Sequence, residues 1–190
     1  MNNKGFKAYL IISIFLILIV GMGLSYSYFV YDRDLSDASL SAGKIDINFS
    51  NGDNFITVPN AYPVSDQIGK IYPYYADFSI TGETSTKPIK YEIHLIPNDG
   101  TSLNGNYIKV FLTDQNDNVI LNPTLYSNLT NAVNGGKIIN SGTMTGNNGT
   151  VKSTVKNYRL RVWIDENYDL NQTKKFGFGI YLYAYNDDNN

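Results

Sequence analysis

Alternation of apolar and polar residues dominates the chain after residue 42 and predicts short β-strands. In residues 43–50, for example, Ile45, Ile47 and Phe49 fall on one face of an extended chain and polar residues fall on the other. The same pattern recurs in six later segments: residues 55–58, 74–81, 89–96, 107–113, 158–164 and 176–185. Short strands separated by turn residues predict an all-β fold, an antiparallel β-sandwich with a jelly-roll-like arrangement.

Three segments between the strands carry turn, helix or loop signals. Asn51-Gly52 is typical of a two-residue hairpin turn, so we expect the strands on either side of it to pair. Residues 123–133 predict one short helix, because Pro123 suits a first helical position and apolar residues then recur four apart. Residues 140–153 are polar and match no motif, so we expect a mobile loop there.

An uncharged, strongly apolar segment covers residues 8–31. As a helix it would be about 36 Å long at roughly 1.5 Å per residue, and a bilayer core is about 30 Å thick, so it can serve as a retained membrane anchor. It equally suits a secretory signal that signal peptidase cuts after Ser27, because Ser25 and Ser27 hold the small-residue positions of a cleavage site. In both cases Lys4 and Lys7 keep the N-terminus inside, and the rest of the chain is exported to the cell surface or beyond.

These patterns together divide the chain into four parts. Residues 1–27 are predicted to be the signal peptide or membrane anchor, and residues 28–42 an N-terminal extension. The β-sandwich domain is predicted over residues 43–186, followed by a polar tail at residues 187–190.

Composition then narrows the functions that this domain can have. The chain has no Cys and one His, which excludes disulfides, Cys-based catalysis, Cys-ligated zinc and two-His metal sites. A net charge of -2 argues against a nucleic-acid partner held through phosphate contacts. We therefore predict a protein that is not an enzyme and that has no catalytic, cofactor-binding or metal site.

Two acidic loops carry residues of the kind that bind a metal ion. Asp165, Asn167 and Asp169 place oxygen-bearing side chains at every second position, as in the front half of a calcium loop. Leu170, however, occupies the position that needs Gly, so a polar loop with Asx-turn hydrogen bonds is the alternative. Residues 114–118 are similar, and we expect a hairpin turn there.

Side chains on the polar faces of three strands suggest contacts outside the core. His94 shares a face with Glu92, so we expect it to meet solvent or a neighbouring subunit. Arg159 and Arg161 share a face with Trp163, which predicts stacking of Arg on aromatic rings across the sheet. An exposed platform for a glycan is the alternative use of the aromatic residues, formed by Trp163, Tyr181, Tyr183 and Tyr185.

The junction between the apolar segment and the first strand carries a recognisable motif. Small residues up to Ser27 precede the aromatic Tyr28, and residues 42–47 read AGKIDI. This junction resembles the TasA/camelysin family of exported fibre proteins, in which an A-G-x-[IL]-D-[IL] strand opens the domain. The later sequences YRLRVWID and FGFGIYLYAY also look like closing strands of that family. The family's Pro-Gly-Asp/Glu turn after the second strand is not visible, and PVSD at residues 63–66 stands in its place.

The resemblance implies a jelly-roll subunit of extracellular biofilm-matrix fibres. Family members polymerise when the N-terminal segment of one subunit adds as a strand to the next, so the partner would be a second copy of this chain. Cleavage would release residues 28–41, in which Tyr28, Val30, Leu35 and Leu40 are candidate anchors. Alternatively, this segment is a stalk, and the protein is a membrane-anchored monomeric adhesin or glycan-binding module.

Overall fold

The computed structural model describes residues 39–40, 43–84, 88–146, 152–169 and 174–186. The chain divides into Met1–Asp37 and Ala38–Asn190, and all the described residues belong to the second part. The predicted signal or anchor, most of the N-terminal extension and the polar tail lie outside the described residues. No helix within the described ranges is long and apolar enough to cross a membrane.

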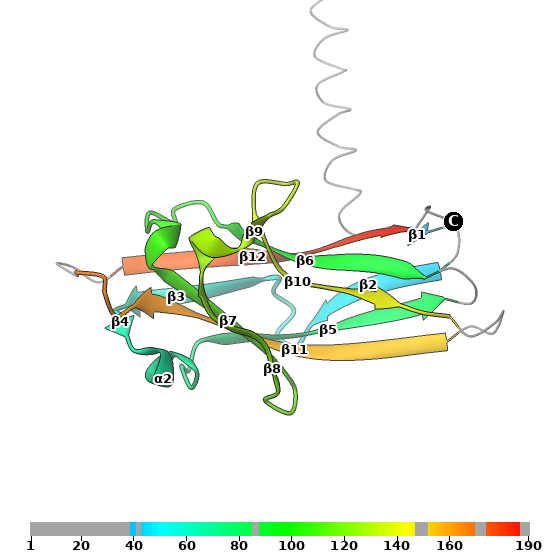
Figure 1. The fold of residues 1–190 in the computed structure, drawn as a ribbon, viewed down its shortest axis with the longest axis horizontal. Helices are drawn as coiled ribbons and strands as arrows, with labels where there is room; N and C mark the ends of the chain where they lie inside the picture. The colour runs from blue at the N-terminus through cyan, green and yellow to red at the C-terminus, as the bar shows by residue number, and fades with distance from the viewer. Residues whose placement is uncertain (1–38, 41–42, 85–87, 147–151, 170–173, 187–190) are drawn as a thin grey trace, which may run out of the picture. The chain divides into compact units, whose positions relative to one another are not determined.

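Two β-sheets make up the domain, as Figure 1 shows. Sheet A contains, in spatial order, β1 (Ser39–Leu40), β2 (Gly43–Phe49), β5 (Tyr75–Thr84), β11 (Lys152–Asp165), β7 (Ile108–Asp114) and β8 (Val119–Leu125). Sheet B contains β3 (Phe55–Ala61), β12 (Lys174–Asn186), β6 (Ile89–Pro97), β10 (Lys137–Met144) and β9 (Thr130–Asn131). The pairings are antiparallel except for β4 (Pro63–Val64), which runs parallel to β11. The predicted all-β fold with antiparallel sheets is confirmed.

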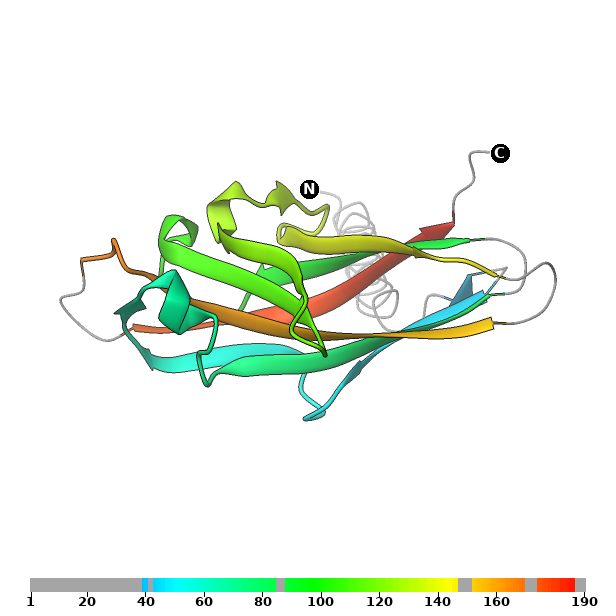
Figure 2. The same ribbon diagram turned by 60° about the horizontal axis from the view of Figure 1, so that its bottom comes forward.

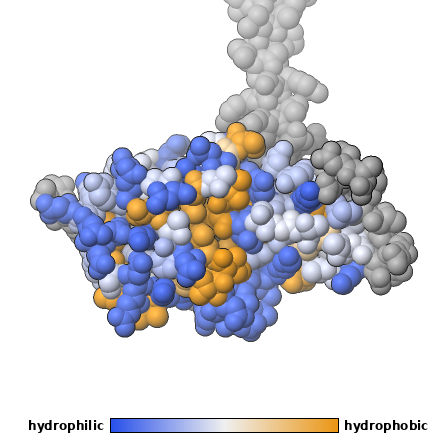
Figure 3. Space-filling model, in the orientation of Figure 1, coloured by the Kyte–Doolittle hydropathy of each residue, from blue (hydrophilic) through white to orange (hydrophobic). Residues whose placement is uncertain are grey.

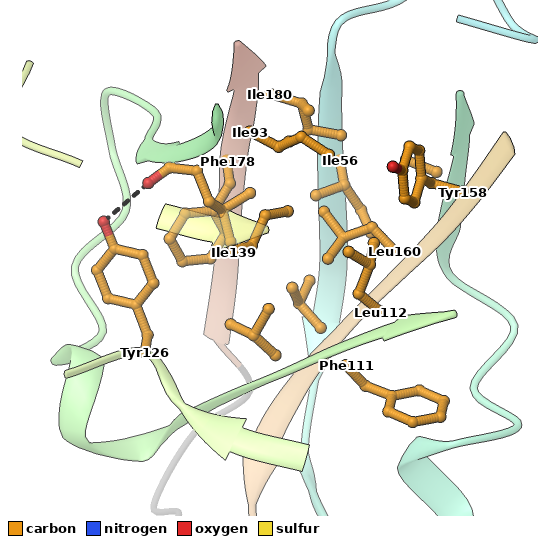
Figure 4. Close-up of a cluster of buried hydrophobic side chains, with 14 of the residues drawn as sticks. Ile56, Ile93, Phe111, Leu112, Tyr126, Ile139, Tyr158, Leu160, Phe178 and Ile180 are labelled. Atoms are coloured by element: carbon orange, nitrogen blue, oxygen red, sulfur yellow. Dashed lines mark hydrogen bonds between the residues drawn. The ribbon is translucent and has the colours of Figure 1, made fainter. Parts of the chain in front are cut away.

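The hydrophobic core lies between the sheets and is built from the alternating residues that predicted the strands. Leu112, Tyr158 and Leu160 reach it from sheet A, and Ile93 and Phe178 from sheet B (Figure 4). Burial of each such side chain contributes roughly 1.5–3 kcal/mol. The core residues that the structure describes all come from the second part of the chain, so we expect Ala38–Asn190 to fold without the first 37 residues.

The turn at Asn51-Gly52 forms, but the predicted hairpin is wrong. Gly52 has a φ of +77°, and its N–H donates to the carbonyl of Phe49 at 3.1 Å. The strands on either side nevertheless lie in different sheets, β2 in sheet A and β3 in sheet B. Residues 50–54 separate the two strands, and this length lets the chain cross from one sheet to the other instead of reversing within one.

The helix predicted over residues 123–133 is also wrong. β8 runs through Pro123 and is followed by the short 3-10 helix η2 (Tyr126–Asn128) and then by β9. Proline is tolerated in β8 because that strand lies at the edge of sheet A. Tyr126 is buried against Phe178, with ring centroids 5.0 Å apart, and donates a hydrogen bond to the carbonyl of Leu95 at 3.1 Å (Figure 4). These tertiary contacts override the local helical spacing.

The one short α-helix in the described part of the chain is α2 (Asp66–Gly69), which the sequence pattern does not predict. It begins after Ser65, which has an extended conformation, and Asp66 places an acid in its first turn. Gly69 at its end is buried, and a Cβ there would overlap the indole of Trp163. The helix therefore covers part of the outer face of sheet A.

The loop predicted over residues 140–153 is shorter than expected. β10 continues to Met144, which is buried, and β11 already begins at Lys152. Residues 147–151 lie outside the described ranges. The error arose because both strands carry polar residues in these halves, so that the apolar alternation is weak.

Candidate functional site

One flank of the sandwich has unpaired strand edges on both sheets. Residues 140–144 of β10 pair with β6 on one side, and Ile139 falls at an irregularity in that register. No described strand pairs with residues 139–144 on the other side. Residues 152–157 of β11 likewise pair with β5, whereas β7 pairs with β11 only from Tyr158 onward. Figure 2 shows β10 and β11 bordering this side of the domain, with the β7–β8 hairpin at one end. We call residues 139–144 and 152–157 the open flank.

A groove of about 470 Å³ lies in the open flank. Its lining comes from both sheets and from the β7–β8 hairpin: Tyr91, Asp114, Gln115, Asn116, Ile120, Asn140, Ser141, Val155, Lys156, Asn157 and Tyr158. Val155 is 55% exposed although it is apolar. On the face drawn in Figure 3, a band of hydrophobic residues crosses the domain, and the surface beside it over β10 and β11 is mainly polar or neutral.

The base of the groove is a pair of tyrosines that meet between the sheets. The hydroxyls of Tyr91 and Tyr158 are 2.9 Å apart, and the side-chain amide of Asn140 donates to the Tyr158 hydroxyl at 3.3 Å. Burial, with the Tyr91 hydrogen bond second, raises the pKa of Tyr158 well above its ordinary value. Lys156 places its ammonium 5.3 Å from the centre of the Tyr91 ring. The groove thus offers fixed polar groups at its base and unpaired backbone at its rims.

The end of the groove is closed by the turn between β7 and β8. The Asp114 carboxylate accepts hydrogen bonds from the backbone of Asn116 at 2.8 Å and of Asn118 at 2.9 Å. The Asn118 side chain also donates to it, and this bond is the main cause that lowers the pKa of Asp114. The predicted hairpin turn is confirmed. Asn157 of β11 donates to Gln115 at 2.8 Å, which ties the turn to the open flank.

The other sheet edges carry features that hinder pairing. β1 covers the start of the outer edge of β2, where Lys44 and Asp46 form an ion pair at 2.8 Å. β3 contains Pro59 and is irregular where it pairs with β12, and β8 contains Pro123. Proline and charge are ordinary ways of blocking an edge. The open flank differs from these edges in that unpaired edges of both sheets border one groove there.

Trp163 does not join the tyrosines in an exposed aromatic platform. Trp163 is 0% exposed in sheet A, where it packs edge-on to Phe111 at 6.3 Å. Tyr183 and Tyr185 are exposed on sheet B, with ring centroids 5.8 Å apart. The predicted stacking of Arg on aromatic rings is present, but the ring that receives Arg159 and Arg161 is Tyr75.

His94 is buried rather than facing solvent, so that part of the prediction is wrong. Its ring stacks on Tyr183 at 5.5 Å, and its Nε2 is 2.8 Å from the carboxylate of Glu92. Its Nδ1 finds no hydrogen-bond partner within the described residues. Tyr183 of β12 packs on the ring, and the sequence of β6 alone does not predict this contact.

The loop after β11 forms the Asx turn that was one of its two predicted uses. The Asp165 carboxylate accepts from the backbone of Asn167 at 2.9 Å and lies 3.3 Å from the ammonium of Lys109. Burial opposes ionisation of Asp165, but the bonds from Asn167 and Lys109 outweigh it and lower its pKa. Asp169 is exposed. Within the described ranges, no three His, Asp or Glu side chains come together as a metal site.

No model of a known protein family matches the chain, and no curated protein matches it either. Among solved structures, the chain is similar to the carbohydrate-binding module TmCBM61 in complex with β-1,4-galactotriose. The identity is 8% and the TM-score 0.21, over 82% of this chain and 93% of that one. A similarity at this score supports no conclusion about this chain. Fold and site together define a two-sheet antiparallel β-sandwich with one open flank.

Proposed function

We propose that this chain is a non-catalytic subunit of an extracellular fibre, of the TasA/camelysin type. In this proposal, the N-terminal extension of one subunit pairs as a β-strand with the next subunit. The observation that carries the proposal is the open flank, where β10 and β11 each have a half without a described strand partner on one side.

The open flank has the chemistry that strand addition needs. Unpaired backbone N–H and C=O groups template the binding of an extended chain, and pockets beside them accept its alternate side chains. Here the two strand edges belong to different sheets, and the groove between them holds about 470 Å³. An added strand could pair with β10 or β11 and place side chains over Tyr91 and Tyr158 at the base.

The order of the strands supports a jelly-roll fold for the domain. The strands pair in a nested order, in which an early strand of the chain pairs with a late one and the middle strands pair with each other. The nested pairs are β3 with β12, β5 with β11, β6 with β10, and β7 with β8. This nesting is that of a long hairpin rolled into two sheets, which is the jelly-roll arrangement. It agrees with the fold that the resemblance to the fibre family implies.

The donated strand would come from residues 28–38 of a second copy. Ser39 and Leu40 already form β1 on the chain's own β2, so Leu40 is not available as an anchor. Tyr28, Val30 and Leu35 are the apolar residues that we assign to the pockets. Cleavage after Ser27 would free this segment outside the membrane, and processing would control assembly.

Imaging of two forms of the protein tests this proposal. Residues 28–190 and residues 38–190 are purified, and their size distributions are compared with negative-stain micrographs over a range of pH, salt and concentration. The second form retains β1 and so keeps the domain intact. We expect filaments from the longer form only. If both forms remain monomeric, the segment is a stalk and the membrane-anchored adhesin becomes the better assignment.

A substitution in the groove tests whether the open flank receives the strand. Ser141→Trp places an indole in the groove at an exposed position of β10, and Ser102→Trp makes the same change at an exposed loop position elsewhere. We expect the first variant of residues 28–190 to remain monomeric and the second to form filaments, with equal melting temperatures. Filaments from both variants would place the acceptor edge elsewhere.

A further inference from the structure

The outer face of sheet A carries an ordered row of polar and aromatic side chains, most of which lie outside the open flank. The register of β5 and β11 sets Tyr75 opposite Arg161, Asp77 opposite Arg159, and Ser79 opposite Asn157. These six residues lie outside the hydrophobic core, and Asn157 also lines the groove of the open flank. Beside the row, a hollow of about 220 Å³ is lined by Ser50, Asp77, Phe78, Ser79, Gln115, Asn157, Tyr158 and Arg159.

The polar groups around the hollow are held in fixed positions. Arg159 donates to both oxygens of Asp77, at 2.7 and 2.8 Å, and this pairing raises the pKa of Arg159. Asn157 is held by its bond to Gln115 at 2.8 Å. A two-point guanidinium–carboxylate pair fixes geometry and cancels charge while leaving further donor and acceptor positions open. The hollow is therefore a rigid surface of mixed donors and acceptors.

Arg161 is a largely buried cation without an acidic partner. It is 9% exposed, and its Nε donates to the carbonyl of Tyr72 at 3.2 Å. No acid in the described residues pairs with it, because Asp77 is engaged by Arg159. Its Nη atoms make no hydrogen bond within these residues, and neither of them is sealed from solvent. A buried charge calls for a counter-charge, so this part of the face favours an anionic group.

Exposed tyrosine rings stand next to this cation. Tyr75 is 44% exposed, and its ring centre lies 5.4 Å from the Arg161 guanidinium and 4.5 Å from that of Arg159. Tyr74 is 39% exposed and packs on Tyr72 at 5.6 Å. Tyrosine rings offer a flat apolar surface with a polar tip, which suits a ligand that has both apolar and hydroxylated sides.

We infer that the outer face of sheet A binds an acidic polysaccharide, with a uronate carboxylate on Arg161 and the sugar ring on Tyr75. Hydroxyl groups of neighbouring sugars reach Asp77 and Asn157 in the hollow, whose lining includes both donors and acceptors. An acidic peptide would satisfy Arg161 but would leave the polar groups of the hollow without hydroxyl partners. The site adjoins the open flank and shares Asn157 with it, but Tyr75 and Arg161 lie outside the flank and its groove, so a fibre of such subunits would still present these two residues along its sides.

Affinity electrophoresis tests the inference directly. Residues 38–190, which lack the proposed donor strand, are run in native gels that contain polygalacturonate, its methyl ester, or polyglutamate. The ester removes the charge and keeps the sugar, and polyglutamate keeps the charge without a sugar. We expect retardation by polygalacturonate that is about ten-fold weaker for each control polymer, a difference of about 1.4 kcal/mol. Absence of retardation, or equal binding to polyglutamate, would overturn the inference.

Substitutions then locate the site. Tyr75→Ala removes an exposed ring and should weaken binding about ten-fold without loss of the fold, and Arg161→Gln should do the same if it remains folded. Tyr183→Ala is the matched control, because Tyr183 is similarly exposed but lies on sheet B. A loss with Tyr183→Ala and none with Tyr75→Ala would move the site to sheet B and contradict the inference. Because these proteins lack residues 28–37, the result does not depend on whether the fibre proposal holds.

Discussion

Residues 158–165 and residues 152–157 of β11 belong to one strand but have different neighbours. Residues 158–165, the closed half, pair with both β5 and β7 as far as Arg161 and then with β7 and the short β4. Residues 152–157, the open half, pair with β5 alone. Trp163 in the closed half is fully buried, whereas Val155 in the open half is 55% exposed. The position of a strand in a sheet, rather than its own sequence, thus decides whether its outer face becomes core or interaction surface.

The closed half is stabilised on both of its faces. Leu160, Val162 and Ile164 are buried between the sheets, and on the outer face α2 and Phe111 cover Trp163. The open half has neither the second strand partner nor the covering helix. We therefore expect substitutions in the closed half to affect stability, and substitutions in the open half to affect assembly.

The largest effect should come from Trp163→Ala. Removal of this buried indole should lower the free energy of unfolding by about 3–5 kcal/mol, measured by urea unfolding of residues 38–190. Val155→Ala, in the open half of the same strand, should change it by no more than about 0.5 kcal/mol. Equal losses from the two substitutions would show that the two halves of β11 are equally packed.

A smaller loss is expected from Gly69→Ala. The added Cβ would overlap the Trp163 indole, and such overpacking costs about 1–3 kcal/mol. Gly100→Asn is a suitable control, because Gly100 has a φ of +85° and open space around it, and Asn tolerates this conformation. The free energies of unfolding of the two variants are compared in urea. An unchanged free energy of unfolding for Gly69→Ala would mean that α2 does not pack tightly against Trp163.

The tyrosine pair at the base of the groove joins the two sheets where the open and closed halves of β11 meet, and its two members should show coupling. Tyr158→Phe leaves the buried Tyr91 hydroxyl without its partner, which should cost about 1–2 kcal/mol. Tyr91→Phe combined with Tyr158→Phe should cost less than the sum of the single changes, because no hydroxyl of the pair then lacks a partner. A double-mutant cycle of unfolding free energies measures this. Strict additivity would contradict the hydrogen bond.

The smallest effect is a change of stability with pH that depends on Tyr126 of η2. Burial raises the pKa of Tyr126 from 10.0 to about 12. Because the folded value exceeds the unfolded one, the stabilisation is complete below pH 10 and declines as the pH rises toward 12. Thermal melts across this window should show a shallower decline for Tyr126→Phe than for the unchanged chain. Identical slopes would mean that Tyr126 titrates normally in the folded state.

Much of the fold could be predicted because alternation is a local property. All seven predicted strands are present, and the Asx turns at Asp114 and Asp165 form from residues close together in sequence. The partners of each strand were less accessible, as the crossover at Gly52 shows. Turn chemistry specifies a change of direction, but it does not specify the sheet in which the next strand lies.

The sites could not be predicted because they depend on which distant elements cover each side chain and on how neighbouring strands are aligned. His94, Phe111 and Trp163 alternate with core residues as polar-face residues should, yet all three are buried by elements distant in the chain. The open flank could not be predicted because most residues of its two strand segments are polar, so that the sequence there is typical of a loop. The row around Arg161 becomes visible only once β5 and β11 are aligned residue by residue.

Hydrogen exchange of backbone amides, in monomers of residues 38–190 and in filaments of residues 28–190, tests the central claim most directly. An added strand on the open flank should slow exchange in residues 139–144 and 152–157 on assembly. Exchange in β8, which is the other edge near the groove, should be unchanged. Protection that appears along β8 or β2, while the open flank continues to exchange as in the monomer, would contradict the account.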